Sequence, residues 1–435
     1  MNIRQLQEVN DRKRVVVTGL GVIAPNGIGK ELFWKNTMNG KSGVREIDRF
    51  PLNGFNARIA GLVDDFDPEK LGISEKDSER LDRYAQFAVA AAKMAIEDAD
   101  LIYSEINKDR IGVNIANAIC GTRYMEDNFL EMTDYGKGRL DHNWAQQALY
   151  HASTFNVASS EVASIYGFRG PCSTMATGCT AGLDALGFSL DVIRDGHADI
   201  MVTGASEAPI TPIAMAAFDV IGALSDKRNH TPSKASRPFD LDRDGFVLAE
   251  GCGILILEEL NHAIRRGATI YAEVRGFGST CNAYHMTDLP ADGQDLARAI
   301  QIALQDSCIA PHEIDYISAH GSSTRQNDTN ETAAYKSVLG KHAYRVPISS
   351  LKSMTGHPLA GANAIESVAA AMGIRTNQIP PTINYETSDP NCDLNYVPNE
   401  GFESEVNVVL KNASGFSGIH SAVVFTKPEY EGASL

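Results

Sequence analysis

The sequence predicts an α/β protein that is built from two similar halves. Strand-like apolar runs alternate with runs at helical spacing, a pattern that is typical of βαβ units. One set of residues recurs at a constant offset, so that Ala95, Asp98, Glu105 and Ile106 return as Ala303, Asp306, Glu313 and Ile314. A second run is echoed in the same way, Ala181-Gly182-Leu183-Asp184-Ala185 by Ala360-Gly361-Ala362-Asn363-Ala364. An internal duplication of βαβ units explains both repeats.

The composition narrows the class of protein. The chain has 435 residues, 43% of them hydrophobic, and a formal net charge of -16 without a long basic run, which disfavours nucleic acid as a partner. Its seven cysteines form no Cys-x-x-Cys pair, so neither a zinc site nor a disulfide framework is indicated, and we expect no bound metal. No apolar run is long enough to span a bilayer, and residues 1–14 lack the apolar core of a secretory signal, which predicts a cytoplasmic protein.

The first strand leads into a sequence that imitates a nucleotide-binding motif. Residues 14–18 read as a buried strand, and residues 19–24 match the dinucleotide pattern G-x-G-x-x-A. That motif must open a helix directly, whereas Pro25-Asn26-Gly27 forms a turn. We therefore reject nucleotide binding.

The chain then alternates between helices and strands. We expect a helix over 81–98, strands over 110–116 and 199–203, a polar loop over 225–239, a strand over 246–257 and a helix over 260–266. The irregular stretch 117–170 mixes Gly, Tyr, Phe and Met, which suits a cap or a subunit contact. Residues 240–245 imitate a calcium loop, but position 251 holds Gly where the last ligand should be, and strands rather than helices flank it, so we predict a turn.

Cys179 lies where a predicted strand, 172–177, gives way to a predicted helix, 181–194. The first N–H groups of a helix carry partial positive charge, which favours a thiolate. A lone cysteine is more often a small buried residue. The polar segments of the second half of the chain, described next, favour a role for Cys179 as a nucleophile.

Three polar turns in the second half follow or precede predicted strands. Strand 314–319 ends at His320, strand 346–350 is followed by Lys352 and His357, and residues 412–418 precede strand 422–426. The ends of parallel strands are where α/β folds place their sites. A cysteine thiolate can accept an acyl group, and two neutral imidazoles can stabilise an enolate or oxyanion.

These segments together resemble the β-ketoacyl-[acyl carrier protein] synthases. The resemblance rests on Gly178-Cys179-Thr180-Ala181-Gly182, on residues 320–324 and 352–358, and on the Gly415-Phe416 turn, and it extends from residue 14 to about 427. It is closest to the ketosynthase-α subunits of type II polyketide systems, because of residues 182–185, 193–196 and 207–213 and because Ser414 stands where fatty-acid enzymes tend to carry Phe.

The resemblance implies a fold and a domain division. The fold is thiolase-like, with two βαβαβαββ halves in a five-layered α-β-α-β-α arrangement. The halves are expected at 14–270, with the nucleophile and cap, and at 271–427, with the histidines. Residues 1–13 and 428–435 are expected to be tails.

The resemblance also implies roles for individual residues. Cys179 is the expected acyl-accepting nucleophile, and His320 and His357 are expected to support decarboxylation of a malonyl thioester, with Lys352 and Glu366 holding charge and orientation. Phe416 is expected to gate the site and to complete the oxyanion hole with Cys179. The phosphopantetheine-binding hydroxyls would be those of Ser322 and Thr324, and the supporting carboxylates those of Asp328 and Glu331.

The implied reaction is a decarboxylative Claisen condensation that yields a β-ketoacyl-acyl carrier protein. No permanently bound cofactor is implied, since the substrates are carried on the phosphopantetheine of an acyl carrier protein. The implied assembly is a homodimer or a heterodimer with a chain-length-factor subunit, and we consider Arg80, Lys227 and Arg228 as carrier-docking cations. Three alternatives are a fatty-acid 3-oxoacyl-acyl carrier protein synthase II, a catalytically silent chain-length-factor-like subunit and a biosynthetic thiolase. Silent subunits usually lack the nucleophile, and a thiolase would carry it earlier and add a late cysteine.

Overall fold

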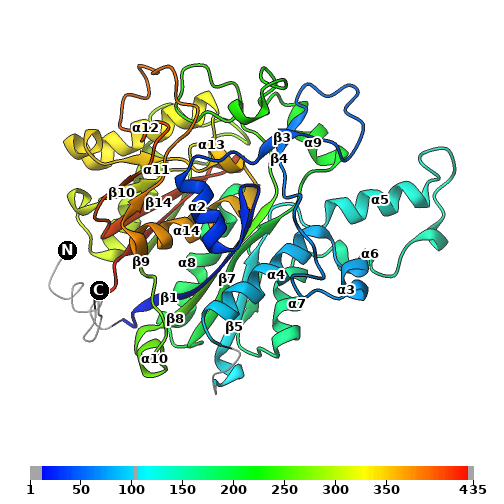
Figure 1. Cartoon of the computed structure of the whole chain (residues 1–435), viewed down its shortest axis with the longest axis horizontal. Coiled ribbons are helices and arrows are strands. Elements are labelled where there is room, and N and C mark those ends of the chain that lie inside the picture. Colours follow the sequence, from blue (N-terminus) through cyan, green and yellow to red (C-terminus); the bar gives the residue numbers. More distant parts are fainter. Residues whose placement is uncertain (1–11, 102–105, 430–435) are drawn as a thin grey trace.

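The computed structural model describes residues 12–101 and 106–429. Most of the two predicted tails, and Glu105 of the predicted repeat, lie outside the described residues. One large mixed sheet forms the centre of the molecule, with helices on its faces (Figure 1). Among the described residues, no helix is both long and apolar enough to cross a membrane.

The sheet consists of two half-sheets with the same strand pattern. In the first half, two antiparallel strands are followed by three that run parallel to one another: β1 (Val15–Ala24), β8 (Gly251–Glu259), β7 (Ile200–Glu207), β5 (Ile111–Ala116) and β6 (Cys172–Ser173). The second half repeats this order: β9 (Ala272–Cys281), β15 (Ile419–Thr426), β14 (Val408–Ser414), β10 (Tyr316–Ser318) and β11 (Ile348–Ser349). Antiparallel pairing of β1 with β9 joins the halves, as the predicted duplication requires.

Helices form the other three of five layers. Helices α4 (Arg83–Asp98) and α7 (Val157–Tyr166) cover the outer face of the first half-sheet, and α11 (Gln294–Ser307) and α12 (Arg325–Leu339) cover that of the second. Helices α8 (Ala181–Arg194) and α14 (Leu359–Thr376) pack against each other between the half-sheets. This is the predicted thiolase-like α-β-α-β-α arrangement.

The two repeats in the sequence mark equivalent contacts in the two halves. A Cβ at Gly19 of β1 would lie 2.2 Å from the carbonyl oxygen of Ala95, and a Cβ at Gly276 of β9 would lie 2.4 Å from that of Ala303. Only glycine allows the strand and helix to approach so closely. The glycines of the false nucleotide motif therefore serve strand–helix packing.

The repeated aspartates make equivalent hydrogen bonds beside these glycines. The Asp98 carboxylate accepts the backbone N–H of Leu20 at 2.9 Å, and the Asp306 carboxylate accepts that of Phe277 at 3.1 Å. In the central layer, a Cβ at Gly182 of α8 would lie 2.6 Å from the carbonyl oxygen of Ala360, in the start of α14. Small residues recur in both helices because the helices cross here.

Shorter elements complete the chain. These are β2 (Gly27–Ile28), α2 (Lys30–Met38), β3 (Val44–Glu46), β4 (Ile59–Gly61), α3 (Glu75–Arg80), α5 (Thr122–Met132), α6 (Leu149–Ala152), α9 (Pro212–Asp219), α10 (Leu260–Arg265), α13 (Lys352–Thr355), β12 (Gln378–Ile379) and β13 (Phe402–Glu403). Helix α5 and the chain after it project from the body of the molecule (Figure 1). The stretch predicted as a cap therefore leaves the sheet after β5, projects at α5 and returns through α7 to the sheet at β6.

Several predicted strands differ in extent from those observed. The strands predicted over 14–18 and 199–203 continue to Ala24 and Glu207, the strand predicted over 422–426 begins at Ile419, and residues 412–414 of the predicted turn 412–418 belong to β14. The run 172–177 pairs with β5 only over Cys172 and Ser173, because the chain then leaves the sheet to form the turn of Cys179. The run 246–257 is a continuous strand only from Gly251, and residues 246–249 make isolated bridges to other loops. The predicted turn at 240–245 is confirmed: the Asp240 carboxylate accepts hydrogen bonds from Arg237 and three backbone N–H groups.

Candidate active site

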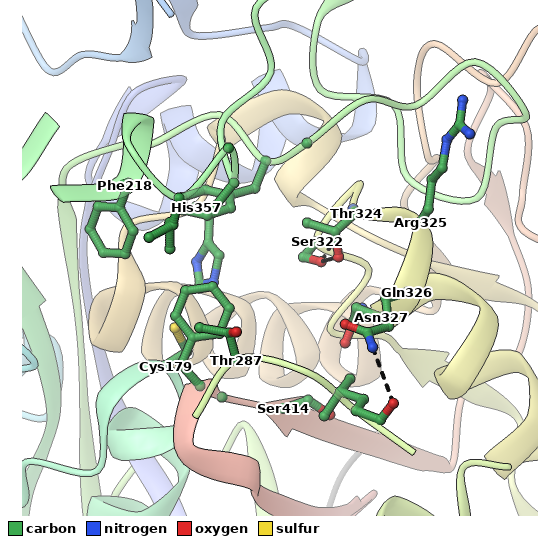
Figure 2. Close-up of a pocket in the computed structure, with 18 of the residues that line it drawn as sticks. Cys179, Phe218, Thr287, Ser322, Thr324, Arg325, Gln326, Asn327, His357 and Ser414 are labelled. Atoms are coloured by element: carbon green, nitrogen blue, oxygen red, sulfur yellow. Dashed lines mark hydrogen bonds between the residues drawn. The ribbon is translucent and has the colours of Figure 1, made fainter. Parts of the chain in front are cut away.

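A cavity of about 560 Å³ lies between residues from both halves of the chain. It contains six of the residues predicted from the sequence, Cys179, His320, Ser322, Thr324, His357 and Phe416. Figure 2 shows Cys179 and His357 together at one side, with Ser322 and Thr324 across the cavity and Arg325 extending away at its margin. Residues separated by more than 200 positions in the chain therefore face the same space.

Cys179 lies in a turn that polar side chains hold in place. A single 3-10 turn, Gly178–Thr180, connects the end of β6 to α8. The buried carboxylate of Asp184 accepts hydrogen bonds from the hydroxyls of Thr177, Thr180 and Ser421, and the side-chain amide of Asn363 donates to the carbonyl oxygen of Cys179. The turn is thereby fixed against both halves.

The prediction of a resting thiolate at Cys179 is wrong. Burial raises the pKa of the Cys179 thiol to about 11, and the nearby carboxyl of Glu207 acts in the same direction. The positive charge of Lys352 and the backbone N–H of Phe416 lower this pKa, but less than burial raises it. Because the helix start does not overcome desolvation, Cys179 is a thiol at neutral pH and must lose its proton to react.

The two histidines enter the cavity from separate loops of the second half. His320 follows β10, and its backbone N–H and that of Gly321 donate to the carboxylate of Glu331 at 2.6 and 2.8 Å. His357 precedes α14, and its backbone N–H donates to the carbonyl oxygen of Val247 at 2.7 Å. The ring centroids are 5.1 Å apart and the planes are inclined by 81°.

Both imidazoles are neutral. Burial, together with the positive charges of Lys352 and Lys411, holds the pKa values of His320 and His357 well below the ordinary value of 6.5. Within the part of the chain that the structure describes, the buried Nδ1 atom of each ring has no hydrogen-bond partner. Since an unpartnered buried N–H is rarer than an unpartnered acceptor, the proton is best placed on Nε2, where each ring is a donor.

Three fully buried charges lie next to the histidine loop. Lys352 Nζ lies 2.6 Å from one oxygen of the Glu366 carboxylate and donates to the carbonyl oxygen of His320 at 2.8 Å. Lys411 Nζ lies 2.7 Å from the other oxygen of Glu366. Two lysines therefore share one carboxylate.

The remaining predicted residues line or support the same cavity. The hydroxyls of Ser322 and Thr324 are 2.9 Å apart and both face the cavity. The backbone N–H groups of Phe416 and Cys179 are directed at the Cys179 sulfur. A Cβ at Gly415 would be only 3.5 Å from the Cys179 nitrogen, so this loop packs directly on the nucleophile turn.

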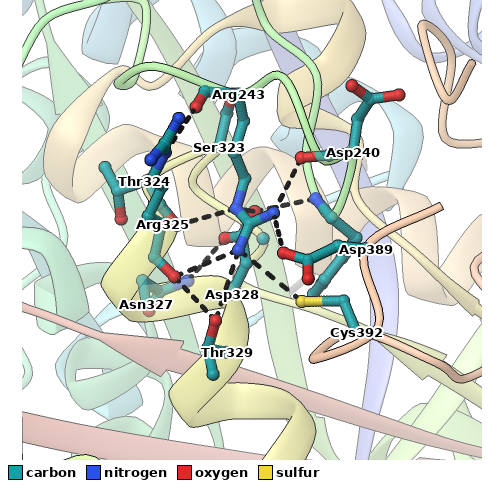
Figure 3. Close-up of polar contacts among 12 residues, drawn as sticks. Asp240, Arg243, Ser323, Thr324, Arg325, Asn327, Asp328, Thr329, Asp389 and Cys392 are labelled. Atoms are coloured by element: carbon teal, nitrogen blue, oxygen red, sulfur yellow. Dashed lines mark hydrogen bonds and ion pairs between the residues drawn. The ribbon is translucent and has the colours of Figure 1, made fainter. Parts of the chain in front are cut away.

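Asp328 and Arg243 tie the loops around the cavity together (Figure 3). The buried carboxylate of Asp328 accepts the backbone N–H of Phe239 at 2.8 Å and lies 3.4 Å from the Arg243 guanidinium. Arg243 also donates to Asp389 and to the carbonyl oxygens of Asp240, Thr324 and Arg325. One buried cation thus connects the first turn of α12 with two loops.

Replacing Arg243 with Met is expected to destabilise the fold by about 3–5 kcal/mol, because it leaves the carboxylates of Asp328 and Asp389 buried without their cation. Urea unfolding measures the loss of free energy of unfolding. Arg325→Met is the control, since this neighbouring arginine is exposed and its replacement should cost less than about 0.5 kcal/mol. Equal stability of the two variants would contradict the assignment of Arg243 as the connecting residue.

The comparisons with known proteins agree with this geometry. The model of the β-ketoacyl synthase N-terminal domain matches residues 12–263, and that of the C-terminal domain matches residues 271–386. The chain belongs to the β-ketoacyl synthase family. Its members transfer and condense acyl groups, so the chain is an acyltransferase.

Several relatives cover nearly the whole chain of this β-ketoacyl synthase. The ketoacyl synthase alpha subunit of the tetracenomycin polyketide synthase of Streptomyces glaucescens is 46% identical over 96% of this chain and 98% of its own length. A type II polyketide synthase acyl-carrier protein has been solved in complex with its ketosynthase bound to a hexaketide, and a chain of that structure is 49% identical with a TM-score of 0.90 over 96% of this chain and 100% of its own. The ishigamide ketosynthase/chain length factor is 34% identical with a TM-score of 0.88, over 96% of this chain and 100% of its own.

The sequence analysis did not predict three residues that contribute to this β-ketoacyl synthase site. Asp184 was noted only as part of a repeat and of the family resemblance, although it holds the nucleophile turn. Glu207 ends β7, where its buried carboxyl accepts the backbone N–H groups of Ala118 and Ile119. Lys411 directly follows the apolar residues 408–410 in the buried strand β14, and a charge at such a position is the signal that could have revealed it.

Proposed function

We propose that this chain catalyses the decarboxylative Claisen condensation of malonyl-acyl carrier protein with an acyl group held on Cys179, as the ketosynthase of type II polyketide chain elongation. The observation that carries the proposal is the single cavity shared by one thiol and two neutral imidazoles. The polyketide relatives support the choice of pathway. The presence of Cys179 argues against a silent subunit.

Acyl transfer is the first step. The ring of His357 points towards Cys179 (Figure 2) and, being neutral with its proton on Nε2, keeps Nδ1 free to accept the thiol proton as the sulfur attacks the incoming thioester. The new S–acyl bond forms, the bond to the pantetheine sulfur breaks, and the departing thiolate takes the proton from His357. The N–H groups of Cys179 and Phe416 are placed to stabilise the oxyanion that forms in between.

Condensation is the second step. The malonyl carbonyl oxygen accepts hydrogen bonds from the Nε2–H groups of His320 and His357, the C–C bond to the carboxylate breaks, and CO₂ leaves. The electron pair remains as an enolate, which attacks the thioester on Cys179. The product is a β-ketoacyl chain on the carrier protein, and the released Cys179 thiolate takes up one proton from water to restore the resting thiol.

We assign the carrier arm to the wall opposite the nucleophile. The paired hydroxyls of Ser322 and Thr324 would hydrogen-bond the amides of phosphopantetheine. These amides are uncharged, so small uncharged hydroxyls suit them better than charged side chains would. Glu331 and Asp328 support this wall through the backbone, as described above. No permanently bound cofactor enters the proposal.

A dimeric partner is proposed at the projecting segment. Large apolar side chains there are each more than half exposed: Phe129, Tyr135, Leu140, Trp144 and Tyr150. An exposed apolar cluster of this kind marks an interaction surface. The ketosynthase/chain length factor neighbour supports a heterodimer, and the halves 14–270 and 271–427 would form one cytoplasmic subunit of it.

Mass spectrometry of the carrier protein tests the proposed function. The chain is incubated, alone and with a chain-length-factor subunit, with malonyl-carrier protein and an acyl-loaded carrier protein. We expect β-ketoacyl-carrier protein lengthened by two carbons per cycle. If Cys179 is acylated but the carrier protein is never extended, the condensing function is excluded. Accumulation of polyketo chains, rather than single extension of saturated chains, separates the polyketide from the fatty-acid alternative.

The structure changes which cations are proposed to dock the carrier protein. Lys227 and Arg325 line the cavity. Arg80 is engaged by the carboxylates of Glu161 and Asp77, and Arg228 lies 3.8 Å from Asp244. Arg80 and Arg228 are therefore already paired within the chain, and Lys227 and Arg325 are the better candidates.

Reversing both charges, Lys227→Glu with Arg325→Glu, is expected to weaken binding of an acidic carrier protein about tenfold, since each exposed ion pair contributes at most about 1 kcal/mol. Titration by fluorescence anisotropy at low salt measures the affinity. The control is Lys76→Glu, an exposed lysine in α3 outside the cavity lining. Unchanged affinity in the double variant would place the docking surface elsewhere.

A further inference from the structure

We propose that Lys411 is a positioning residue for condensation, which with Lys352 gives a buried Lys352–Glu366–Lys411 cluster one net positive charge and so keeps His320 and His357 neutral. This inference rests on the proposed function. Lys411 lies outside the sequence motifs on which the family resemblance rests. Strand β14 brings it next to the loop that carries His320.

The positions of Lys352, Glu366 and Lys411 show that the net positive charge of the cluster is buried. The side chains of Lys352, Glu366 and Lys411 are each at most 1% exposed. Each lysine takes a different oxygen of the single carboxylate, at 2.6 and 2.7 Å. With one carboxylate for two ammonium groups, the cluster itself carries one net positive charge, and the Glu331 carboxylate is a further negative group that acts on Lys411.

The surroundings of Lys411 stabilise its charged form. Its Nζ donates to the carbonyl oxygen of Asn412 at 2.6 Å and to those of Ser318 and Ala319 at 3.3 Å. Burial lowers the pKa of Lys411 to about 8, which leaves it mostly cationic at neutral pH. Since Ser318 and Ala319 immediately precede His320, the ammonium group lies against the strand end that presents this imidazole.

The other charged and titratable groups around the histidines do not provide the same effect. Glu331 of α12 is negative, and its carboxylate is occupied by Tyr335, Asn412 and the backbone N–H groups of His320 and Gly321. His420 of β15 is itself neutral, because burial lowers its pKa to about 4. The charged and titratable groups that act on His320 are thus Lys352 of α13, Lys411 of β14, His357 and His420, and those that act on His357 are Lys352 and Lys411. Glu207 acts on the Cys179 thiol instead.

A neutral imidazole is what the reaction needs from each histidine. A protonated His320 or His357 could not accept a proton from the Cys179 thiol, whereas a neutral ring has both a free nitrogen that can accept this proton and an N–H that can donate to the enolate oxygen. A positive charge in the low-dielectric interior disfavours a second one nearby. Lys411 therefore acts on the substrate through the protonation state of the histidines, without touching it.

The test is a charge series measured by NMR of ¹⁵N-histidine-labelled protein between pH 4.5 and 8, with His320→Asn and His357→Asn used to assign the signals. In the unaltered chain both rings should stay neutral throughout. Lys411→Met removes one charge and should raise the titration midpoint of at least one ring by about one pH unit or more, to above pH 5. Lys411→Gln, which keeps a hydrogen-bond donor, serves if the Met variant does not fold, with the same expected shift.

Restoring the charge separates electrostatics from structure. Lys411→Met with Glu366→Gln regains one net positive charge while still lacking Lys411, so both rings should again be neutral to pH 4.5. Folded Lys411 variants whose histidines remain neutral to pH 4.5 would overturn the proposal, and so would a double variant that titrates like the single one. Because ring protonation is observed directly, this result is independent of whether the chain condenses polyketide units.

Discussion

Cys179→Ala is expected to abolish both acyl loading of the protein and condensation. Among the described residues, Cys179 provides the only sulfur in the cavity lining, and alanine offers no atom that can form the acyl bond. The surrounding turn should persist, because Asp184 holds it through Thr177 and Thr180 rather than through the sulfur. Intact-protein mass spectrometry after incubation with acyl-carrier protein measures loading, and carrier-protein mass measures condensation.

Two exposed cysteines provide matched controls for this experiment. Cys172 lies at the sheet edge and Cys281 at the end of β9, and both are accessible to solvent. Cys172→Ala and Cys281→Ala should each load and condense as the unaltered chain does. If the Cys179→Ala variant still carried the acyl label, and one of the two control variants lost it, the exposed cysteine replaced in that control would be the nucleophile instead of Cys179.

The sequence was sufficient for the architecture because the duplicated contacts require particular residues. Gly19 with Ala95, and Gly276 with Ala303, meet at distances that no larger side chain allows, so the repeat could be recognised without coordinates. The boundaries of β6 could not be predicted in this way. Residues 174–177 have strand-like composition, and only the turn that carries Cys179 takes them out of the sheet.

The electrostatics of the site depend on contacts that no local pattern shows. A helix start next to Cys179 predicted a thiolate, but the pKa of the thiol depends mainly on burial, and then on the charge of Lys352, the backbone N–H of Phe416 and the carboxyl of Glu207, all distant in the sequence. Lys411 is the clearest case. Its charge is visible in the sequence, whereas its position opposite Lys352 on Glu366 follows only from the pairing of β10 with β14 and the packing of α14 against β14.

His320→Ala and His357→Ala are each expected to slow malonyl decarboxylation by about 10²–10³-fold, the cost of one hydrogen-bond donor to a developing oxyanion. Both rings present a neutral donor to the same space, with centroids 5.1 Å apart, so removal of either leaves the enolate oxygen half stabilised. Release of CO₂ from malonyl-carrier protein measures this step without requiring condensation. Some acyl loading of Cys179 should survive in both variants.

The two variants should differ in loading, which gives the prediction a second, internal check. His357 points towards Cys179, so His357→Ala removes the group that we expect to accept the thiol proton and should load more slowly than His320→Ala. His262→Ala, which removes an imidazole paired with Glu258 on β8, is the control and should leave both steps unchanged. Because both active-site imidazoles have pKa values well below 6.5, decarboxylation by the unaltered chain should not decline as the pH falls through 6.5. A normal decarboxylation rate in either alanine variant would remove that histidine from the mechanism.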